Sequence, residues 1–175
     1  MRKILIVPVG RIDSDVLNNI SASLEKTFHR SVDIGEETPV PYDSYHAGRR
    51  QYHSTRILKE LQAMRGKHIE RVLGVTDADL YVPELNFVFG EADISSGVTV
   101  ISVKRLRQEF YGQPQNRELL MERCVKEAIH EIGHTYGLVH CPEPGCIMFF
   151  SNSLKDTDFK GRGFCSVCKL QVKID

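Results

Sequence analysis

Short apolar runs and stretches of helical periodicity alternate along the first part of the chain. Residues 3–9 (KILIVPV) form a nearly continuous, largely β-branched apolar run, which is typical of a strand buried on both faces. Beyond Asp13 and Ser14, either of which can cap a helix, apolar residues recur with the period of an α-helix. These apolar positions are Val16, Leu17, Ile20, Leu24 and Phe28. The pattern therefore predicts a central strand followed by an amphipathic helix.

The middle of the chain predicts a second strand, a loop and a second helix. Residues 31–36 have the pattern of a strand. Residues 38–53 contain two prolines, one glycine and three tyrosines, which favour a loop. A helix is expected over roughly residues 50–65, ending at Gly66.

Three more strand candidates follow the second helix. Residues 71–76 (RVLGVT) predict a third strand, and residues 86–89 and 98–103 predict two more, separated by GEADISSG. Five strands with two intervening helices indicate an α/β fold. We therefore expect a twisted, mostly parallel sheet of about five strands, backed by two helices.

Length and charge limit the classes of function. With 175 residues, of which 41% are apolar and 26% charged, the chain can bury one core but not two ordinary ones. The 23 basic residues balance the 23 acidic residues, so no overall field attracts nucleic acid or an anionic membrane. We therefore expect a single domain, residues 1–175, with neither nucleic acid nor a membrane among its partners.

No apolar segment has the length of an export signal or a membrane anchor. The run at residues 4–9 is about half as long as a signal-peptide core, and no small-residue cleavage site follows it. No segment approaches the roughly 20 apolar residues of a membrane helix. We therefore expect a cytoplasmic protein.

A dense group of ligand-type side chains occupies residues 130–140, HEIGHTYGLVH. The helix that carries it is expected to start near Pro114 or Gln115 and to stop at Gly137. Gly133 lies inside this helix, where its lack of a side chain would allow close packing.

The spacing of these side chains fits one metal ion. On a helix, His130 and His134 lie on the same face, where both imidazoles can bind a single cation. Glu131 projects beside that cation and can take a proton from a metal-bound water without occupying a ligand position. Gly137 can adopt the left-handed conformation, which turns the chain so that His140 returns toward the same metal. Three histidines leave one tetrahedral position open, as in catalytic zinc sites.

An alternative is that these are ordinary helix residues with solvated histidines. The short pattern HExxH occurs by chance, but in HExxHxxGxxH the glycine and the third histidine fall where a chain reversal and a third ligand are needed. The longer pattern therefore favours a zinc site, and spacing alone indicates a zinc hydrolase.

Four of the five cysteines lie in the last part of the chain. They are Cys141, Cys146, Cys165 and Cys168. Four thiolates can close a tetrahedral zinc site that folds a small C-terminal lobe; disulfides in an oxidising compartment are the alternative. The fifth, Cys124, lies at an apolar position of the predicted helix, and we expect it to be a small buried residue.

The motif and the residues that come after it resemble a known family. HExxHxxGxxH followed by a methionine turn is the metzincin pattern, and Met148 takes the place of the turn methionine. The cysteines around it make the stretch from His130 to Cys168 similar to the archaemetzincins. The resemblance implies a cleft across the domain and a second, structural zinc in the C-terminal part. It also implies an antiparallel edge strand in the segment 85–93, beside that cleft, and packing of Met148 beneath the histidines.

We therefore predict a metzincin-like domain with an N-terminal subdomain, residues 1–137, and a zinc-stapled C-terminal subdomain, residues 138–175. Its activity would be that of a zinc metallopeptidase, with Glu131 as the general base and two zinc ions, one catalytic and one structural. We expect a peptide or protein substrate and a monomer. The alternative is a protein- or nucleic-acid-binding module built on the four cysteines, with a vestigial histidine site, which the intact Glu131 disfavours. No residue can be assigned from sequence to stabilise the oxyanion.

Overall fold

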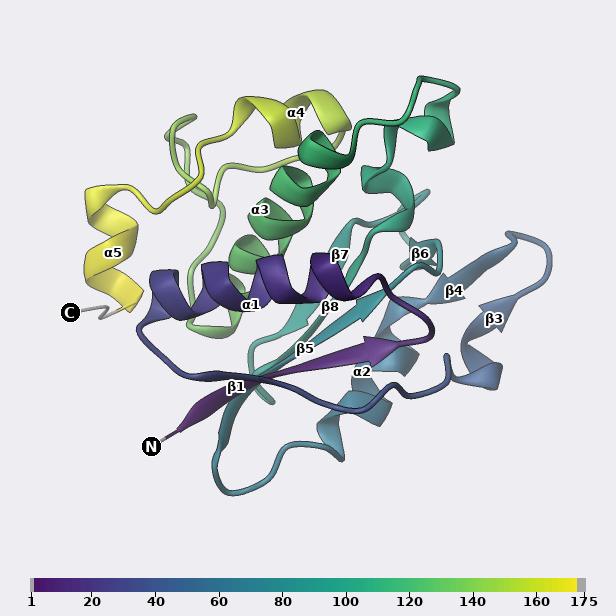
Figure 1. Ribbon diagram of the computed structural model, residues 1–175, viewed down its shortest axis with the longest axis horizontal. Coiled ribbons are helices and arrows are strands. Elements are labelled where there is room, and N and C mark those ends of the chain that lie inside the picture. The colour runs from purple at the N-terminus through teal and green to yellow at the C-terminus, as the bar shows by residue number, and fades with distance from the viewer. Residues whose placement is uncertain (1, 173–175) are drawn as a thin grey trace.

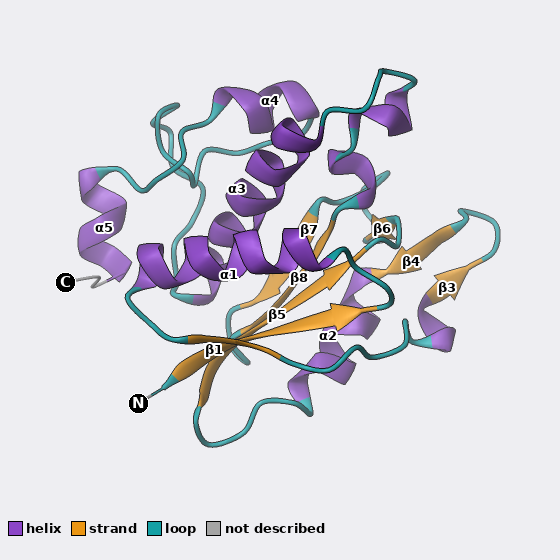
Figure 2. Ribbon diagram, in the orientation of Figure 1, coloured by secondary structure: helices purple, strands orange, loops and turns teal. Residues whose placement is uncertain are grey.

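A five-stranded sheet forms the centre of the computed structural model, which describes residues 2–172 (Figures 1 and 2). The strand order is β2-β1-β5-β8-β7. Four strands are parallel: β1 (Lys3–Val9), β2 (Val32–Ile34), β5 (Ile69–Thr76) and β8 (Val98–Ser102). The edge strand β7 (Gly90–Asp93) is antiparallel to β8. The predicted α/β fold, with its mostly parallel sheet and antiparallel edge strand, is confirmed.

Helices cover both faces of this sheet (Figure 1). On one face lie α1 (Ser14–Phe28) and the long helix α3 (Arg117–Thr135), which contact each other and enclose the larger apolar core. On the other face, α2 (Ser54–Gln62) encloses a second core with strands β1, β5 and β8. The helical period read from the sequence is correct for α1, because all five of its predicted apolar positions are buried.

The segment predicted as a loop contains a small second sheet. After the 3₁₀ turn η1 (Tyr42–Ser44), β3 (Tyr45–His46) pairs antiparallel with β4 (Gln51–His53), which also pairs with β6 (Leu80–Tyr81). The prediction of a helix from residue 50 was therefore wrong at its start. Residues 51–53 take part in strand pairing, and those contacts, made with distant residues, override local helical periodicity.

The predicted strand over residues 86–89 was also wrong, because the edge strand follows it. Although GEAD has weak strand propensity, Gly90 pairs with Ile101 and Asp93 pairs with Val98. A turn closed by the Asp93 carboxylate, which accepts from the Ser95 amide at 3.0 Å, sets this register. Pairing with β8 therefore decides the strand's position, and local hydrophobicity does not.

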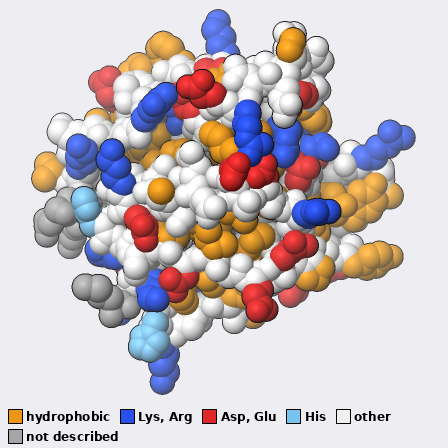
Figure 3. Space-filling model, in the orientation of Figure 1, with side chains coloured by type: hydrophobic (Ala, Val, Ile, Leu, Met, Phe, Trp, Pro, Cys, Tyr) orange, Lys and Arg blue, Asp and Glu red, His pale blue; other side chains and the backbone are white. Residues whose placement is uncertain are grey.

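The remaining elements come directly before and after α3 in the chain. Two short 3₁₀ turns, η2 (Lys104–Leu106) and η3 (Gln108–Tyr111), lead into it, and the short helices α4 (Leu154–Phe159) and α5 (Ser166–Val172) follow it. Neither of these last two helices was predicted. None of the helices within residues 2–172 combines the length and the apolar character needed to cross a membrane. Acidic and basic side chains are mixed on the face shown in Figure 3, in agreement with the balanced charge.

Candidate active site

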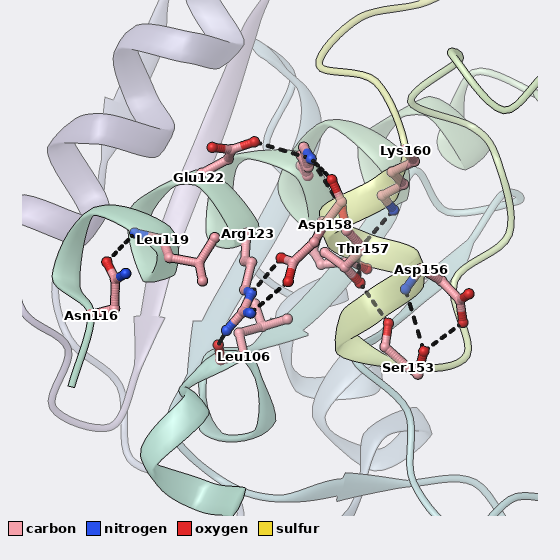
Figure 4. Close-up of polar contacts among 12 residues, drawn as sticks. Leu106, Asn116, Leu119, Glu122, Arg123, Ser153, Asp156, Thr157, Asp158 and Lys160 are labelled. Atoms are coloured by element: carbon pink, nitrogen blue, oxygen red, sulfur yellow. Dashed lines mark hydrogen bonds and ion pairs between the residues drawn. The ribbon is translucent and has the colours of Figure 1, made fainter. Parts of the chain in front are cut away.

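Helix α3 presents the predicted motif at its C-terminal end. Its N-terminus is capped by the side chain of Asn116, which accepts from the Leu119 amide at 3.0 Å (Figure 4). The helix ends at Thr135, and Gly137 follows with φ of 88° in the left-handed region. The predicted stop and chain reversal at Gly137 are therefore confirmed, and the helix starts two to three residues later than expected.

This reversal brings the three predicted histidines together. Ring nitrogens of His130, His134 and His140 all lie within 4.8 Å of one another. The ring centroid of His140 is 5.4 Å from that of His130 and 5.0 Å from that of His134. His130 is buried, His134 is half-buried and His140 is exposed, so the cluster runs from the core to the surface.

Backbone carbonyls fix the tautomers of the two helical histidines. Nδ1 of His130 donates to the carbonyl of Ile147 at 2.9 Å, and Nδ1 of His134 donates to the carbonyl of Leu138 at 2.7 Å. Burial lowers the pKa of both rings below their usual range, most strongly for His130. The rings are therefore neutral, with lone pairs on the two Nε2 atoms.

These two Nε2 atoms lie 3.1 Å apart. With both protons already used at Nδ1, no hydrogen bond can join them, so two lone pairs face each other. A tetrahedral zinc ion with Zn–N bonds of about 2.05 Å would separate its nitrogen ligands by about 3.3 Å. The cluster therefore fits a zinc ion in both donor chemistry and spacing.

Glu131 lies beside this cluster and is 7% exposed. Burial raises the pKa of its carboxyl to about 8, and the neighbouring carboxylate of Glu127 acts in the same direction. Both glutamates and the three histidines line one cavity of about 350 Å³, whose opposite wall includes residues 85 and 87–92. Sequence reasoning missed Gly90 in this wall. A Cβ there would lie 2.7 Å from Cγ of Glu131 and 2.8 Å from the carbonyl oxygen of Val100, so only glycine lets β7 pass this close.

Met148 lies beneath the motif, as expected. It is fully buried, and a Cβ added at Gly133 would approach its Sδ to 2.7 Å. Gly133 therefore allows the methionine to pack directly against α3, which confirms the close packing predicted there. Phe150 lies at the mouth of the cavity, with its ring centroid 4.8 Å from that of His140.

The four predicted cysteines also converge. Their sulfur atoms lie within 4.8 Å of one another, and all are free thiols, with Cys141 Sγ and Cys165 Sγ 3.8 Å apart. That separation is too long for a disulfide and equals the edge of about 3.8 Å expected for a tetrahedron with Zn–S bonds of about 2.3 Å. The backbone amide of Cys168 lowers the pKa of Cys165 to about 7, which favours the thiolate. The set fits a closed metal site.

The chain is also similar to known proteins along nearly its whole length. The profile of peptidase family M54 matches residues 11–174. This chain belongs to peptidase family M54. It is 44% identical to the archaemetzincin of Pyrococcus furiosus over 183 aligned residues, which cover 98% of this chain and 93% of that protein.

Solved structures of similar proteins share the fold along nearly the whole M54 chain. A zinc-dependent peptidase from Methanocorpusculum labreanum superposes with a TM-score of 0.89 at 32% identity, covering 97% of this chain and 99% of that one. The archaemetzincin of Archaeoglobus fulgidus superposes with a TM-score of 0.83 at 41% identity, with the same coverage. The predicted resemblance is confirmed, and the chain is a zinc metallopeptidase.

A buried polar network in this M54 chain was not found from sequence. The Lys160 ammonium is fully buried and binds the Glu127 carboxylate at 2.8 Å, in contact with α3 one turn before His130. Nearby, the Arg123 guanidinium binds both oxygens of Asp158 at 2.7 Å (Figure 4). The signal available in the sequence was the pair of charges at Lys126 and Glu127, which interrupts the apolar spacing of α3. The network joins α4 to the active-site helix.

Proposed function

We propose that His130, His134 and His140 bind the catalytic zinc and that Glu131 is the general base in peptide-bond hydrolysis. The observation that carries this proposal is the pair of Nε2 atoms that face each other at 3.1 Å with both protons held at Nδ1. The three ring nitrogens offer a zinc ion three ligands, and the remaining side opens toward the cavity.

A zinc ion held there would polarise the scissile carbonyl and lower the pKa of a water at its open position to about 7. Glu131 accepts the proton of the attacking water and then delivers it to the leaving amine nitrogen. Its burial supports this role, because a carboxylate with little solvation binds a proton more readily than an exposed one. Gly90 and β7 keep bulk water from the carboxylate on one side.

The substrate is a peptide or protein segment in extended conformation. The wall of the cavity opposite the histidines is the segment that leads into and forms β7, an edge strand with one side of its backbone unpaired by the sheet. Such an edge offers main-chain hydrogen bonds to an added strand. Phe150, which is 51% exposed, offers an apolar contact to one substrate side chain near His140.

The four cysteines bind a second, structural zinc. The spacing of Cys141 and Cys165 and the closed arrangement of four thiols support this assignment. Cys141 directly follows the ligand His140, and its backbone amide donates to the carbonyl of Met148 at 2.9 Å. The second zinc therefore stabilises the segment that carries the third histidine.

The test is the variant Glu131→Gln. Because Glu131 is not a ligand, the variant should retain two zinc ions per chain and its fold, and lose about 10³-fold or more in peptide turnover. Zinc content is measured by elemental mass spectrometry, and turnover is measured with a peptide that the wild-type chain cleaves. Glu118→Gln, an exposed change in the first turn of the same helix, is the matched control and should remain active. Undiminished turnover of Glu131→Gln would contradict the assignment of the base.

A further inference from the structure

A second cavity lies at the carboxyl ends of the neighbouring parallel strands β1 and β5. From β1 the chain passes through α1 to β2 on one side, and later returns through α2 to β5 on the other side. Helices α1 and α2 consequently cover opposite faces of the sheet (Figure 1). The connections diverge at this point and leave a crevice, which is where open α/β sheets bind their ligands.

The crevice is a cavity of about 450 Å³, within the usual range for small-molecule sites. We call it the switch-point cavity. It is lined by residues 9–11, at and just beyond the end of β1, and by residues 76–79, at and just beyond the end of β5. The hairpin of β3 and β4 forms one side of it, where the Tyr52 amide donates to the carbonyl of Asp79 at 2.8 Å. It shares no lining residue with the cavity at the histidines.

The free charges around this cavity are all positive. Arg11, Arg50 and Lys104 are exposed, line the cavity and form no ion pair with any residue between 2 and 172. The three come from separate segments, after β1, in the hairpin turn and after β8.

The two acids in the cavity are neutralised by other residues. Both carboxylate oxygens of Asp79 accept from Arg105, at 2.6 and 2.8 Å, and Asp77 accepts from Arg107. The cavity thus presents three uncompensated cations to one small volume, an arrangement that favours a phosphate group.

An aromatic wall stands beside these cations. The rings of Tyr45 and Tyr52 pack with centroids 5.0 Å apart, and both line the cavity. Tyr45 is 48% exposed, so part of its ring is available to a ligand. Such a ring can stack on a planar base.

The helix that follows β1 does not supply the phosphate contacts here. The Asp13 side chain caps α1, accepts from the Asp15 amide at 2.9 Å and binds Arg117. With the N-terminus of α1 already satisfied by a carboxylate, an anion in the cavity would be held by side-chain cations instead.

We propose that the switch-point cavity binds a small phosphorylated molecule with a planar ring, of the nucleoside monophosphate type. Arg11, Arg50 and Lys104 bind the phosphate, and Tyr45 stacks on the ring. This site is independent of peptide hydrolysis, and its occupation does not require the catalytic residues.

The test is a titration of the zinc-loaded full chain with adenosine monophosphate, inorganic phosphate and adenosine, followed by calorimetry and by NMR amide shifts. The monophosphate should bind at least about tenfold more tightly than either fragment, because it alone offers both groups. Amide shifts should gather at residues 9–11, 45–52 and 76–79. The proposal would be overturned by equal affinity for phosphate and the monophosphate or by amide shifts centred on the histidines. It would also be overturned if the monophosphate did not bind at about 5 mM.

Variants separate the two contacts. Arg11→Gln combined with Lys104→Gln should lower affinity for the monophosphate by about tenfold or more, while leaving the melting temperature unchanged. Lys67→Gln is the matched control, because Lys67 is an exposed cation just before the amino end of β5, whereas the cavity lies at the carboxyl end. Tyr45→Ala should reduce affinity for the monophosphate toward that for phosphate and leave phosphate binding intact. Unchanged affinity in the double variant would refute the site.

Discussion

The histidine cluster and the cysteine cluster are built on different supports. Two of the three histidines belong to one 19-residue helix, and hydrogen bonds to carbonyls hold their rings. The cysteines instead belong to a turn-rich segment and to the start of α5, a helix of seven residues. A packed helix keeps its side chains in place without a metal, whereas short segments need a cross-link to stay together.

The segments that carry the two clusters also differ in how much apolar surface they bury. The part of α3 before His130 is anchored by Leu120, Cys124 and Ala128, which are at most 7% exposed. In residues 138–172, Ile147 and Met148 are buried in the same core, but Phe159 and Leu170 are 68% and 80% exposed. Apolar burial therefore stabilises the helix of the histidine cluster, and we expect the more exposed C-terminal segment to depend on a metal ion bound by the cysteines.

The largest expected difference is in response to a chelator. A three-histidine site has an open position where phenanthroline can bind the ion, and a four-cysteine site has none. Moderate phenanthroline should abolish peptide turnover and remove one of two zinc ions, with the melting temperature near native. Added zinc should restore turnover. Simultaneous loss of both ions together with the fold would contradict the proposed difference between the two clusters.

The second prediction concerns the cysteine cluster itself. Cys165→Ser with Cys168→Ser should release one zinc and lower the free energy of unfolding by about 4 kcal/mol or more. Hydrogen exchange should show the loss mainly in residues 138–172. The control is Cys124→Ala: Cys124 is buried outside the cluster, and burial raises its pKa to about 12, so the change should keep both zinc ions. A double variant as stable as wild type would mean that this lobe folds without metal.

The third prediction tests how firmly the lobe is joined to the active-site helix. Lys160→Met leaves the Glu127 carboxylate buried without its partner, which should cost about 3 kcal/mol of unfolding free energy. Adding Glu127→Leu should recover most of this loss, because an apolar pair replaces the ionic one.

The ion pair of exposed Arg162 with half-buried Glu122 provides the control for that cycle. Arg162→Gln should lower the free energy of unfolding by less than about 1 kcal/mol, because Arg162 is 76% exposed and water screens its ion pair. Denaturant unfolding measures each variant. If Lys160→Met cost no more than Arg162→Gln, the buried pair would not fasten the lobe to α3.

Local chemistry made much of the fold and the candidate site predictable. Continuous apolar runs identify β1, β5 and β8, because strands buried on both faces need apolar side chains on both. The histidine positions follow from helical geometry and from the left-handed Gly137. The local pattern placed the edge strand too early, at residues 86–89 instead of Gly90–Asp93, because pairing with β8 sets the position of this polar segment.

The sequence by itself determined the parts of this protein whose spacing is local: the two histidines one helical turn apart, the reversal that returns the third, and the paired cysteines. Tertiary structure alone decided contacts between residues far apart in the chain. Gly90 makes room for Glu131, Lys160 neutralises Glu127, and three cations from separate segments surround one crevice. Helical and turn geometry fix distances over a few residues, whereas these contacts depend on how the sheet orders its strands and where the connecting segments return.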